Sequence, residues 1–381
     1  MRTNLYIEDF SLLTSLGNGP EVSYSGLKSN PNITSFKIDE KISVPVCQVQ
    51  LPTIKTIDKK ALFFADKVLQ NLEIIKDGKF VDSCKMAILI GCTKGESFSI
   101  SNELNKKLTT FETLQVASSN EINQKLSKKY RIPFIPVSSA ACATGAQLIQ
   151  KASLILAENK FDKIILCMTE ASLTKEMIGA FFQLGVLTKD PMGTTPFSKN
   201  HAGFHIGEGA VALVLTKNKP QSLKGRIIGA ATATDAEHFT TFPNGAKMVW
   251  QTIEELCKKC DIKLDSINHV NLHGTGTIAN DSMELELAKH FISSNPNISF
   301  SALKPYTGHL LGASGLTEFG LTLICAQNSW IPPLLNTHNL ENSITSHFVT
   351  EKIGRNKEIK YFINLSYGLG STIGVILGEN S

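Results

Sequence analysis

Cys142 stands where a predicted buried strand, residues 134–137, turns toward a predicted helix over residues 145–157. At the N-terminus of a helix, unpaired backbone N–H groups and the helix dipole lower the pKa of a thiol and stabilise its thiolate. The residues on either side of the cysteine are alanines, so the carbonyl carbon of a substrate could approach the sulfur. The pattern predicts a nucleophilic cysteine, and the alternative is a small buried cysteine in a tight turn.

Two histidines lie beside glycines, where the backbone can bend and a ligand can come close. His273 stands in NLHGTGT, residues 271–277, and His309 stands in KPYTGHLLGASG, residues 304–315. Each alone could be a structural loop residue, but together with a cysteine between a strand and a helix they predict a Cys-His-His site. The other seven histidines lack this setting, and His205, in an apolar strand, is predicted to be a buried core residue.

The elements that must position these residues are short apolar, β-branched runs that alternate with amphipathic stretches. Strands interleaved with helices predict an α/β architecture with a parallel or mixed sheet. Strands are predicted at residues 86–90, 134–137, 163–168, 210–215, 226–231, 269–272, 298–301, 360–365 and 374–377. Helices are predicted at residues 60–75, 145–157 and 248–260.

A polar segment, KNKPQSLK at residues 217–224, is a candidate boundary between two parts of the chain. We predict that it separates an N-terminal half, residues 1–222, with the cysteine, from a C-terminal half, residues 223–381, with the two histidines. A chain of 381 residues is long enough for two such halves. We expect neither half to be stable alone.

The composition is that of a globular protein and argues against a nucleic-acid-binding, membrane-spanning or secreted protein. Lys and Arg exceed Asp and Glu by four, which is too dilute for nucleic-acid binding but does not oppose an acidic protein partner. No apolar run approaches the ~18 residues that a membrane span needs. The first ten residues lack the long apolar core of a signal peptide and include the acidic residues Glu8 and Asp9. We therefore expect a soluble, cytoplasmic protein with no membrane span.

The eight cysteines are scattered along the chain, which suits reduced thiols in the cytosol better than a disulfide framework. Cys257 and Cys260 have a spacing that occurs in zinc sites, but no second CxxC or HxxxH segment completes four ligands. Cys260 also continues the helical spacing of Val249, Ile253 and Leu256, so we predict a core residue and no metal site.

Six motifs, which lie between Val137 and Thr372, follow one another in the order that a known family has. They are ACATG around Cys142, PF…GFHIGEGA at 196–210, DAEHFTTFPNGA at 235–246, HGTGT…ND…E at 273–284, K…GH..GA.G at 304–315 and YGLGST at 367–372. With them the chain resembles the β-ketoacyl-acyl-carrier-protein synthases of the elongating type, in the thiolase superfamily. The resemblance implies the five-layered αβαβα thiolase-like fold, built from two similar halves, and usually a tight dimer.

The resemblance also implies roles for individual side chains. Cys142 would be the nucleophile that accepts an acyl chain as a thioester. His273 and His309 would help malonyl-carrier protein to lose CO₂ and would stabilise the enolate, provided that both rings are held as neutral donors. Lys304 and Glu284 would orient this pair and set its charge.

Other positions would bind or admit the substrate. The backbone N–H groups of Cys142 and Leu369 would form the oxyanion hole for the thioester. Thr275 and Thr277 would hydrogen-bond the phosphopantetheine arm of the acyl carrier protein, so the chain would need no cofactor of its own and no metal. Leu369 stands where the family has a Phe that gates entry of the acyl chain.

The activity implied is that of an acyltransferase that performs a decarboxylative Claisen condensation. A Cys-bound acyl group and malonyl-acyl-carrier protein give β-ketoacyl-acyl-carrier protein. Relatives primed by acyl-coenzyme A use Cys-His-Asn, and degradative thiolases need a second cysteine that GHLLGASG, residues 308–315, lacks, so both are disfavoured. The partners implied are acyl- and malonyl-loaded carrier protein and a second subunit, either a copy of this chain or a ketosynthase-like chain.

Several recognition positions depart from the family pattern. Residues 195–198 read TPFS in place of Arg-Pro-Phe-Asp, residues 201–202 replace an Arg-Asp pair, and residues 94–132 lack a Pro- and Arg-rich insertion. With Leu369, these changes favour a specialised polyketide or polyene pathway over housekeeping fatty-acid synthesis. The alternative function is a non-catalytic, chain-length-determining partner subunit of a heterodimeric ketosynthase, but such subunits normally lose the nucleophile that Cys142 retains.

Overall fold

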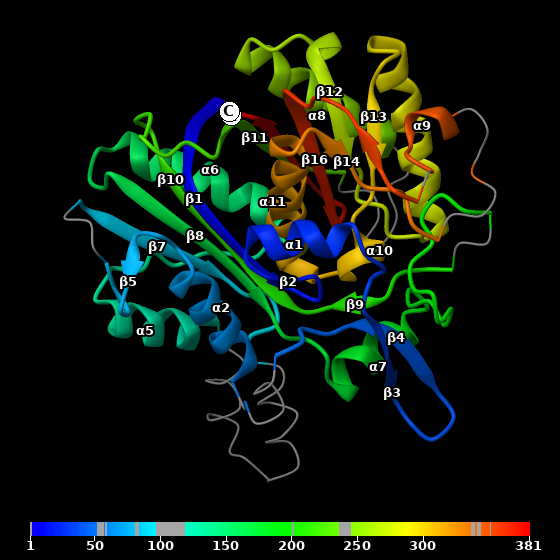
Figure 1. Cartoon of the computed structure of the whole chain (residues 1–381), viewed down its shortest axis with the longest axis horizontal. Helices are drawn as coiled ribbons and strands as arrows, with labels where there is room; N and C mark the ends of the chain where they lie inside the picture. Colours follow the sequence, from blue (N-terminus) through cyan, green and yellow to red (C-terminus); the bar gives the residue numbers. More distant parts are fainter. Residues whose placement is uncertain are drawn as a thin grey trace.

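The computed structural model of the chain describes residues 2–51, 57, 59–80, 84–96, 119–199, 202–235, 245–336, 340, 344–350 and 352–381. Helices lie on and between the arms of a large sheet (Figure 1). Among the described residues, no helix combines the length and the apolar character needed to cross a membrane. The architecture is mixed α/β, as the alternation of strands and helices predicts.

A ten-stranded mixed sheet has the order β13-β12-β16-β17-β11-β1-β10-β8-β7, with β2 beside β1. In its middle, β1 pairs antiparallel with β10 on one side and with β11 on the other. Its strands are β1 (Arg2–Thr14), β2 (Gly17–Asn18), β7 (Met86–Gly91), β8 (Lys163–Glu170), β10 (Gly209–Thr216), β11 (Gly225–Thr234), β12 (Ile267–Asn271), β13 (Ser299–Ser301), β16 (Tyr361–Gly368) and β17 (Thr372–Glu379). Smaller sheets are formed by β3 (Ile33–Lys37), β4 (Ser43–Cys47) and β9 (Ile206–Gly207), by β5 (Ile75–Lys76) and β6 (Lys79–Phe80), and by β14 (Trp330–Ile331) and β15 (Arg355–Asn356).

Helices form three layers with the two arms of this sheet. α6 and α11 lie between the arms, α2 and α5 cover the outer face of β7, β8 and β10, and α8 and α9 cover the outer face of β12, β16 and β17. The α-helices are α1 (Pro20–Leu27), α2 (Lys60–Gln70), α5 (Ser119–Tyr130), α6 (Thr144–Ala157), α7 (Lys175–Gln183), α8 (Gly245–Cys260), α9 (Ile278–Ser294), α10 (Lys304–Thr307) and α11 (Ser314–Gln327). The result is the five-layered αβαβα arrangement that the resemblance implies.

The sequence of β10 explains why helices cover both faces of this strand. Val211, Leu213 and Leu215 belong to the inner core around α6 and α11, while Ala212 and Val214 belong to the outer core under α2 and α5. Successive side chains of a strand point to opposite faces. An uninterrupted apolar strand must therefore be covered on both sides, as in other α/β proteins.

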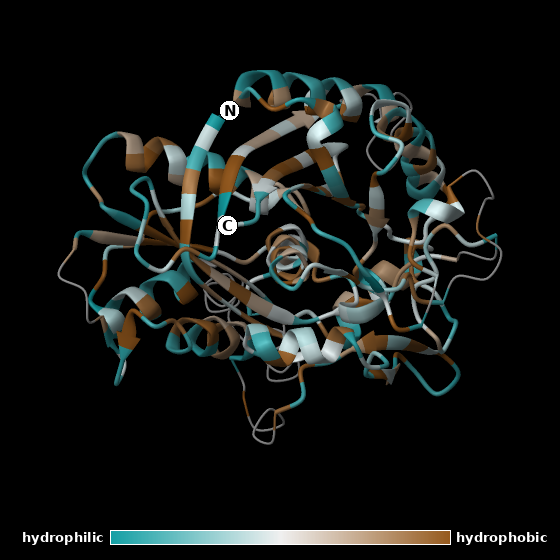
Figure 2. Cartoon of the chain, turned by 45° about the horizontal axis from the view of Figure 1, so that its top comes forward, coloured by the Kyte–Doolittle hydropathy of each residue, from teal (hydrophilic) through white to brown (hydrophobic). Residues whose placement is uncertain are grey.

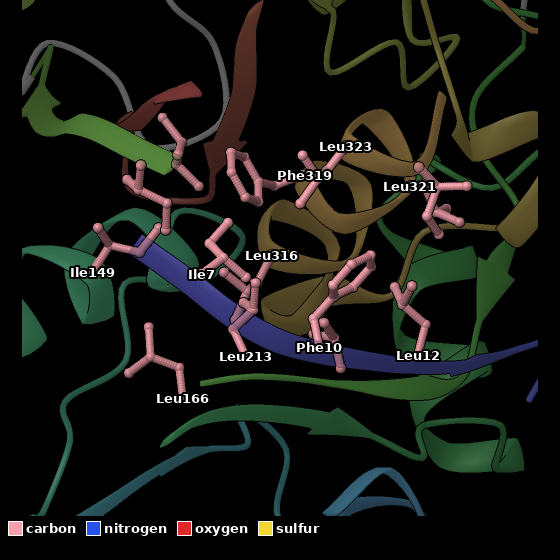
Figure 3. Packing of buried hydrophobic residues seen from close by; sticks show 14 of the residues in the cluster. Ile7, Phe10, Leu12, Ile149, Leu166, Leu213, Leu316, Phe319, Leu321 and Leu323 are labelled. Carbon is pink, nitrogen blue, oxygen red and sulfur yellow. The ribbon is translucent and has the colours of Figure 1, made fainter. Parts of the chain in front are cut away.

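The inner core is built around α11. Figure 3 shows Ile7 and Phe10 of β1 facing Leu316 and Phe319 of this helix. Figure 2 shows hydrophilic residues mainly on the helices at the periphery of the molecule. α11 is instead buried along nearly its whole length, so any charged side chain on it needs a partner inside the protein.

Residues 134–137 do not form the predicted strand beyond a single bridge to Ile88 of β7. The next carbonyl along β7 on that side, that of Ile90, accepts a hydrogen bond from the side chain of Asn123 at 3.3 Å. A side chain from α5 thus takes the acceptor that a longer strand would need. Cys142 is therefore approached by an extended segment rather than by a strand.

The helix predicted at residues 60–75 is shorter in the structure, where α2 ends at Gln70. Asn71, the next residue, donates from its side chain to Ser11 at 3.1 Å and to Asn18 at 2.6 Å. These contacts with another part of the chain end the helix, although the apolar spacing continues past it.

The predicted boundary between residues 222 and 223 falls in the segment that joins β10 to β11. Both strands pair with β1, so the first strand of the chain also lies against the C-terminal segment. The inner core likewise contains residues of both segments. The division into two halves at this point stays a prediction.

Candidate active site

Cys142 lies in the tight turn that leads into α6, which begins at Thr144. Ala141 has a φ of 49°, in the left-handed region that L-residues rarely adopt. The side chain of Thr144 holds the turn, since it accepts from the N–H of Ala140 at 2.9 Å and donates to the carbonyl of Ala141 at 2.6 Å. Gly368 packs against the turn so closely that a Cβ there would lie 3.0 Å from the Cys142 nitrogen. The position of the thiol is thus fixed from two sides.

His309 lies just after α10 and touches the cysteine. Its Nε2 is 3.2 Å from Sγ of Cys142, and its Nδ1 is 2.7 Å from the hydroxyl of Ser314. Burial, and then the charge of Lys304, holds the pKa of His309 well below its usual value, so the ring is neutral. Because the Ser314 hydroxyl can donate or accept, this ring can carry its proton on either nitrogen.

His273 lies just after β12 and faces His309, with the two ring centroids 5.3 Å apart. Its Nδ1 lies 2.9 Å from Nζ of Lys304. A lysine ammonium can only donate, so Nδ1 is the acceptor and the proton of the neutral ring is on Nε2. Burial, and then the charge of Lys304, lowers the pKa of His273 well below its usual value. The ring is thus held as a neutral donor.

Lys304 is 0% exposed and forms a buried ion pair. Its Nζ lies 2.7 Å from Oε1 of Glu318, which projects from α11. The other oxygen of Glu318 accepts from the side-chain amide of Asn271 at 3.1 Å, and Asn271 also donates to Asn364. Removing two charges from water is costly, and the attraction and these hydrogen bonds offset that cost. Glu318 thus holds the ammonium group of Lys304 beside His273.

Glu284 contacts the backbone of His273 and not the side chain of Lys304. It lies in α9 and accepts hydrogen bonds from the backbone N–H of His273 at 2.6 Å and of Gly274 at 2.8 Å. Burial raises the pKa of Glu284 to about 7, against the lowering by these hydrogen bonds. Glu284 thus orients the backbone of His273, while the carboxylate that pairs with Lys304 is Glu318.

The motifs do not predict Glu318, although the sequence contains a signal for it. The segment SGLTEFGLTLICAQ, which forms α11, is uncharged except for this residue. A lone carboxylate in an apolar helix must find a cation or several donors when the helix is buried. Lys304, 14 residues earlier, is that cation.

Three further predicted residues lie in the loops that flank the site. Thr275 and Thr277 are in the loop between β12 and α9, and their hydroxyl oxygens are 2.9 Å apart. Leu369 is in the turn between β16 and β17 and is 43% exposed. Gly368, which precedes it, packs on the backbone of Cys142 and so brings this turn next to Cys142. Their predicted roles toward a substrate stay predictions.

The structure corrects the expected state of the Cys142 thiol. Burial raises its pKa to about 12, the charge of Lys304 opposes this, and the carboxylates of Glu170 and Glu318 add to it. The sulfur is therefore a thiol at rest, because burial outweighs the helix terminus. A base must take its proton during attack, and Nε2 of His309 lies within reach.

The remaining predicted residues are placed as follows. His205 is a buried core residue, as predicted, and Cys257 and Cys260 are buried free thiols in the core under α8 and α9. Within the described ranges, no group of three or more His, Cys, Asp or Glu side chains could hold a metal ion. Residue 201, most of the predicted recognition segment 94–132 and most of the motif at 235–246 lie outside the described residues.

Two family models match this chain. The N-terminal domain of beta-ketoacyl synthase matches residues 64–221, and its C-terminal domain matches residues 224–338. The chain belongs to the β-ketoacyl synthase family.

Curated relatives of this β-ketoacyl synthase family member have moderate sequence identity to it. The 3-oxoacyl-[acyl-carrier-protein] synthase 2 of Coxiella burnetii is 28% identical over 247 residues, which cover 62% of this chain and 59% of that protein. The chloroplastic 3-oxoacyl-[acyl-carrier-protein] synthase II of Arabidopsis thaliana is 26% identical over 331 residues, which cover 83% of this chain and 60% of that protein. The matches thus span less than two thirds of the length of these relatives.

Solved structures with ketosynthases share the fold of this chain. A type II PKS acyl-carrier protein in complex with its ketosynthase matches with a TM-score of 0.84 and 20% identity over all of both chains. The ishigamide ketosynthase/chain length factor matches with a TM-score of 0.83 and 19% identity, again over all of both chains. These similarities confirm the predicted thiolase-like α/β fold of the β-ketoacyl synthases.

Proposed function

We propose that this β-ketoacyl synthase family member is an active decarboxylative condensing enzyme. It joins an acyl group on Cys142 to the two carbons left when malonyl-acyl-carrier protein loses CO₂, and it releases β-ketoacyl-acyl-carrier protein. The observation that carries the proposal is a base beside the Cys142 thiol. Nε2 of His309 lies 3.2 Å from Sγ of Cys142 and can take a proton because Nδ1 faces the Ser314 hydroxyl, and a second neutral imidazole, His273, lies next to it. A subunit that only determines chain length has no need of a thiol with a base beside it.

In the loading step, Sγ of Cys142 attacks the carbonyl carbon of an acyl-carrier thioester while Nε2 of His309 takes the thiol proton. The carbonyl oxygen becomes an oxyanion, which the backbone N–H groups of Cys142 and Leu369 stabilise. The C–S bond to the carrier then breaks, and the proton passes to the departing phosphopantetheine sulfur. The acyl group remains on Cys142 as a thioester.

In the condensing step, the bond between the malonyl carboxylate and its methylene carbon breaks, CO₂ leaves, and the electron pair forms a thioester enolate. Nε2–H groups of His273 and His309 donate to the enolate oxygen, and the fixed charge of Lys304 lowers the energy of the developing negative charge. The enolate carbon attacks the thioester of Cys142, and the C–S bond to the cysteine breaks. The thiolate regains a proton from solvent through His309, whose contact with Ser314 permits either protonated nitrogen.

The proposed substrates arrive on acyl carrier protein, whose phosphopantetheine arm passes Thr275 and Thr277, so the chain needs no cofactor of its own. The solved neighbours include a ketosynthase in complex with an acyl-carrier protein and a ketosynthase in complex with its chain length factor. They support a carrier protein and a second synthase-like subunit as partners. Leu369, in place of an aromatic gate, supports the bulky or stiff chains of a polyketide or polyene pathway.

Mass spectrometry after incubation with a panel of acyl-carrier proteins, together with CO₂ release from malonyl-carrier protein, tests the proposal. We expect an acyl adduct on the peptide of Cys142, and Cys142→Ser should lose both the adduct and condensation, since a hydroxyl is a far weaker acid. Cys257→Ala, which changes another buried thiol, should retain both. An adduct on Cys92 or Cys167 instead would contradict the assignment. A chain that is acylated by no carrier would support the chain-length partner.

A further inference from the structure

A second cysteine–histidine contact lies buried beside the site. Sγ of Cys47 is 3.2 Å from Nε2 of His205, and these residues are 0% and 1% exposed. The Thr194 hydroxyl lies 2.7 Å from Nδ1 of His205, and this nitrogen also accepts from the backbone N–H of Thr194 at 2.9 Å. Since that N–H can only donate, the neutral ring carries its proton on Nε2 and donates to the sulfur of Cys47. Burial lowers the pKa of His205 to about 3, so the ring stays neutral.

This chain of hydrogen bonds continues to the middle of the segment 304–309, which begins with Lys304 and ends with His309. The thiol of Cys47 donates to the carbonyl of Tyr306 in α10 at 3.6 Å. The donors therefore run in one direction, from Thr194 through the imidazole and the thiol to a carbonyl two residues after Lys304. At Gly193, next to Thr194, a Cβ would lie 2.8 Å from the His205 ring, so the loop fits closely around it.

The backbone at His205 holds the C-terminal end of the same segment. The N–H of His309 donates to the carbonyl of His205 at 2.8 Å, and the N–H of Gly207 donates to the carbonyl of His309 at 3.1 Å. β9, which begins directly after His205, pairs with β4, and Cys47 is the last residue of β4 (Figure 1). The 304–309 segment is thus tied at Tyr306 and at His309 to one cysteine–histidine pair.

We propose that His205 and Cys47 are positioning residues that hold the 304–309 segment so that Nε2 of His309 stays in contact with Sγ of Cys142. The proposal deepens the function proposed above, because it concerns the same site. The pair acts through this segment and not on the reacting atoms. An apolar side chain at residue 205 could fill the core equally well, but it could not bond to Thr194 on one side and to Cys47 on the other.

Alkylation of Cys142 by iodoacetamide, followed over a range of pH by mass spectrometry, tests the positioning without any need for condensation. Cys47→Ala removes the acceptor for His205 and the donor to Tyr306, and Cys47→Val removes both while filling the volume. Cys47→Ser keeps a hydroxyl for both roles. Cys257→Ala removes a buried thiol under α8 and α9 and controls for a general loss of packing.

We expect Cys47→Ala and Cys47→Val to slow alkylation of Cys142 at pH 7 on the order of tenfold and to move its pH profile upward, because a displaced base assists less. Cys47→Ser should stay within about twofold of the parent protein, since it restores the hydrogen bonds. Cys257→Ala should match the parent in rate and profile.

The positioning role is wrong if Cys47→Ala and Cys47→Val keep the rate and pH profile of the parent, or if Cys257→Ala slows alkylation as much as they do. If the variants behave as expected while the parent forms no β-ketoacyl product with any carrier protein, the positioning role holds and the proposed function fails. The two outcomes are thereby distinguished.

Discussion

Two cysteine–histidine contacts of equal length lie in this molecule, and they have different surroundings. The distance from Sγ to Nε2 is 3.2 Å both between Cys142 and His309 and between Cys47 and His205. Burial raises the pKa of both thiols to about 12. Neither the distance nor the acidity of the thiol therefore tells a nucleophile from a structural pair.

The partner of the second ring nitrogen does distinguish them. Nδ1 of His309 faces the hydroxyl of Ser314, which can donate or accept, so Nε2 is able to take a proton from the thiol. Nδ1 of His205 also faces a hydroxyl, that of Thr194, but it faces the Thr194 N–H as well. That N–H can only donate, so Nδ1 is an acceptor, and Nε2 already holds its proton and cannot act as a base. A short thiol–imidazole contact is thus evidence for a nucleophile only when the other nitrogen has a partner that allows the proton to move.

Replacing the histidines one at a time should change the activity most and should separate the two contacts. His273→Ala and His309→Ala should lower CO₂ release from malonyl-carrier protein by about 10²- to 10⁴-fold, the range for a lost general acid or base. Some acyl transfer to Cys142 should survive. His205→Ala should lower CO₂ release less than either, because His205 acts only through position. Measured CO₂ release that is unchanged in His273→Ala and His309→Ala would contradict their roles.

The second prediction concerns the ion pair that adjoins only the first contact. Glu318→Ala leaves the buried ammonium of Lys304 without its carboxylate, so the free energy of unfolding should fall by about 3–5 kcal/mol, with loss of condensation. The double variant Lys304→Met/Glu318→Leu should recover most of the stability but not the activity, because it replaces two buried charges with apolar groups. Denaturant titration of both variants measures this. A double variant as unstable as Glu318→Ala would disprove the explanation by an unpaired charge.

The third prediction, with a smaller expected effect, concerns the neutral state of His205 in the Cys47–His205 pair. The pKa of His205 is about 3 in the folded protein against an ordinary 6.5, so the unfolded chain binds the proton first as the pH falls. The stability from this ring is therefore present above pH 6.5 and is lost between pH 6.5 and 3, by about 2 kcal/mol from pH 6.5 to 5.

Urea unfolding at pH 6.5 and at pH 5 measures this contribution. His205→Gln should lose less stability than the parent over this interval, while His290→Gln, on the exposed side of α9, should follow the parent. If His205→Gln and the parent show the same dependence on pH, the ring is not the neutral group that the hydrogen bonds require.

The smallest expected effect is that of replacing Leu369. Leu369 is 43% exposed beside the turn of Cys142, and a phenylalanine there would be a rigid plate with few rotamers. Leu369→Phe should lower kcat/KM for bulky or conjugated acyl chains about two- to tenfold more than for short straight ones. Competition between mixed acyl-carrier proteins measures the ratio. Equal slowing of all chains would mean that this residue sets no selectivity.

Most of the helices and strands, and the residues of the first contact, could be predicted from local patterns in the sequence. The apolar run of β10 predicts a strand covered on both faces, because alternation is a property of neighbouring residues. Cys142 before a helix, and His273 and His309 beside glycines, could be found in the same way, since a turn and its conformational freedom are local. The order of the motifs then placed Lys304 in the same site.

Which side chains from distant segments meet could not be predicted in this way, because it depends on how the chain folds. Glu284 and Glu318 are both carboxylates in helices, and no local pattern states that the second one pairs with Lys304. Cys47 and His205 are 158 residues apart, so their contact depends on the pairing of β4 with β9. The pKa of the Cys142 thiol was likewise decided by burial, because the loss of water around a group depends on the whole fold and not on its neighbours in the chain.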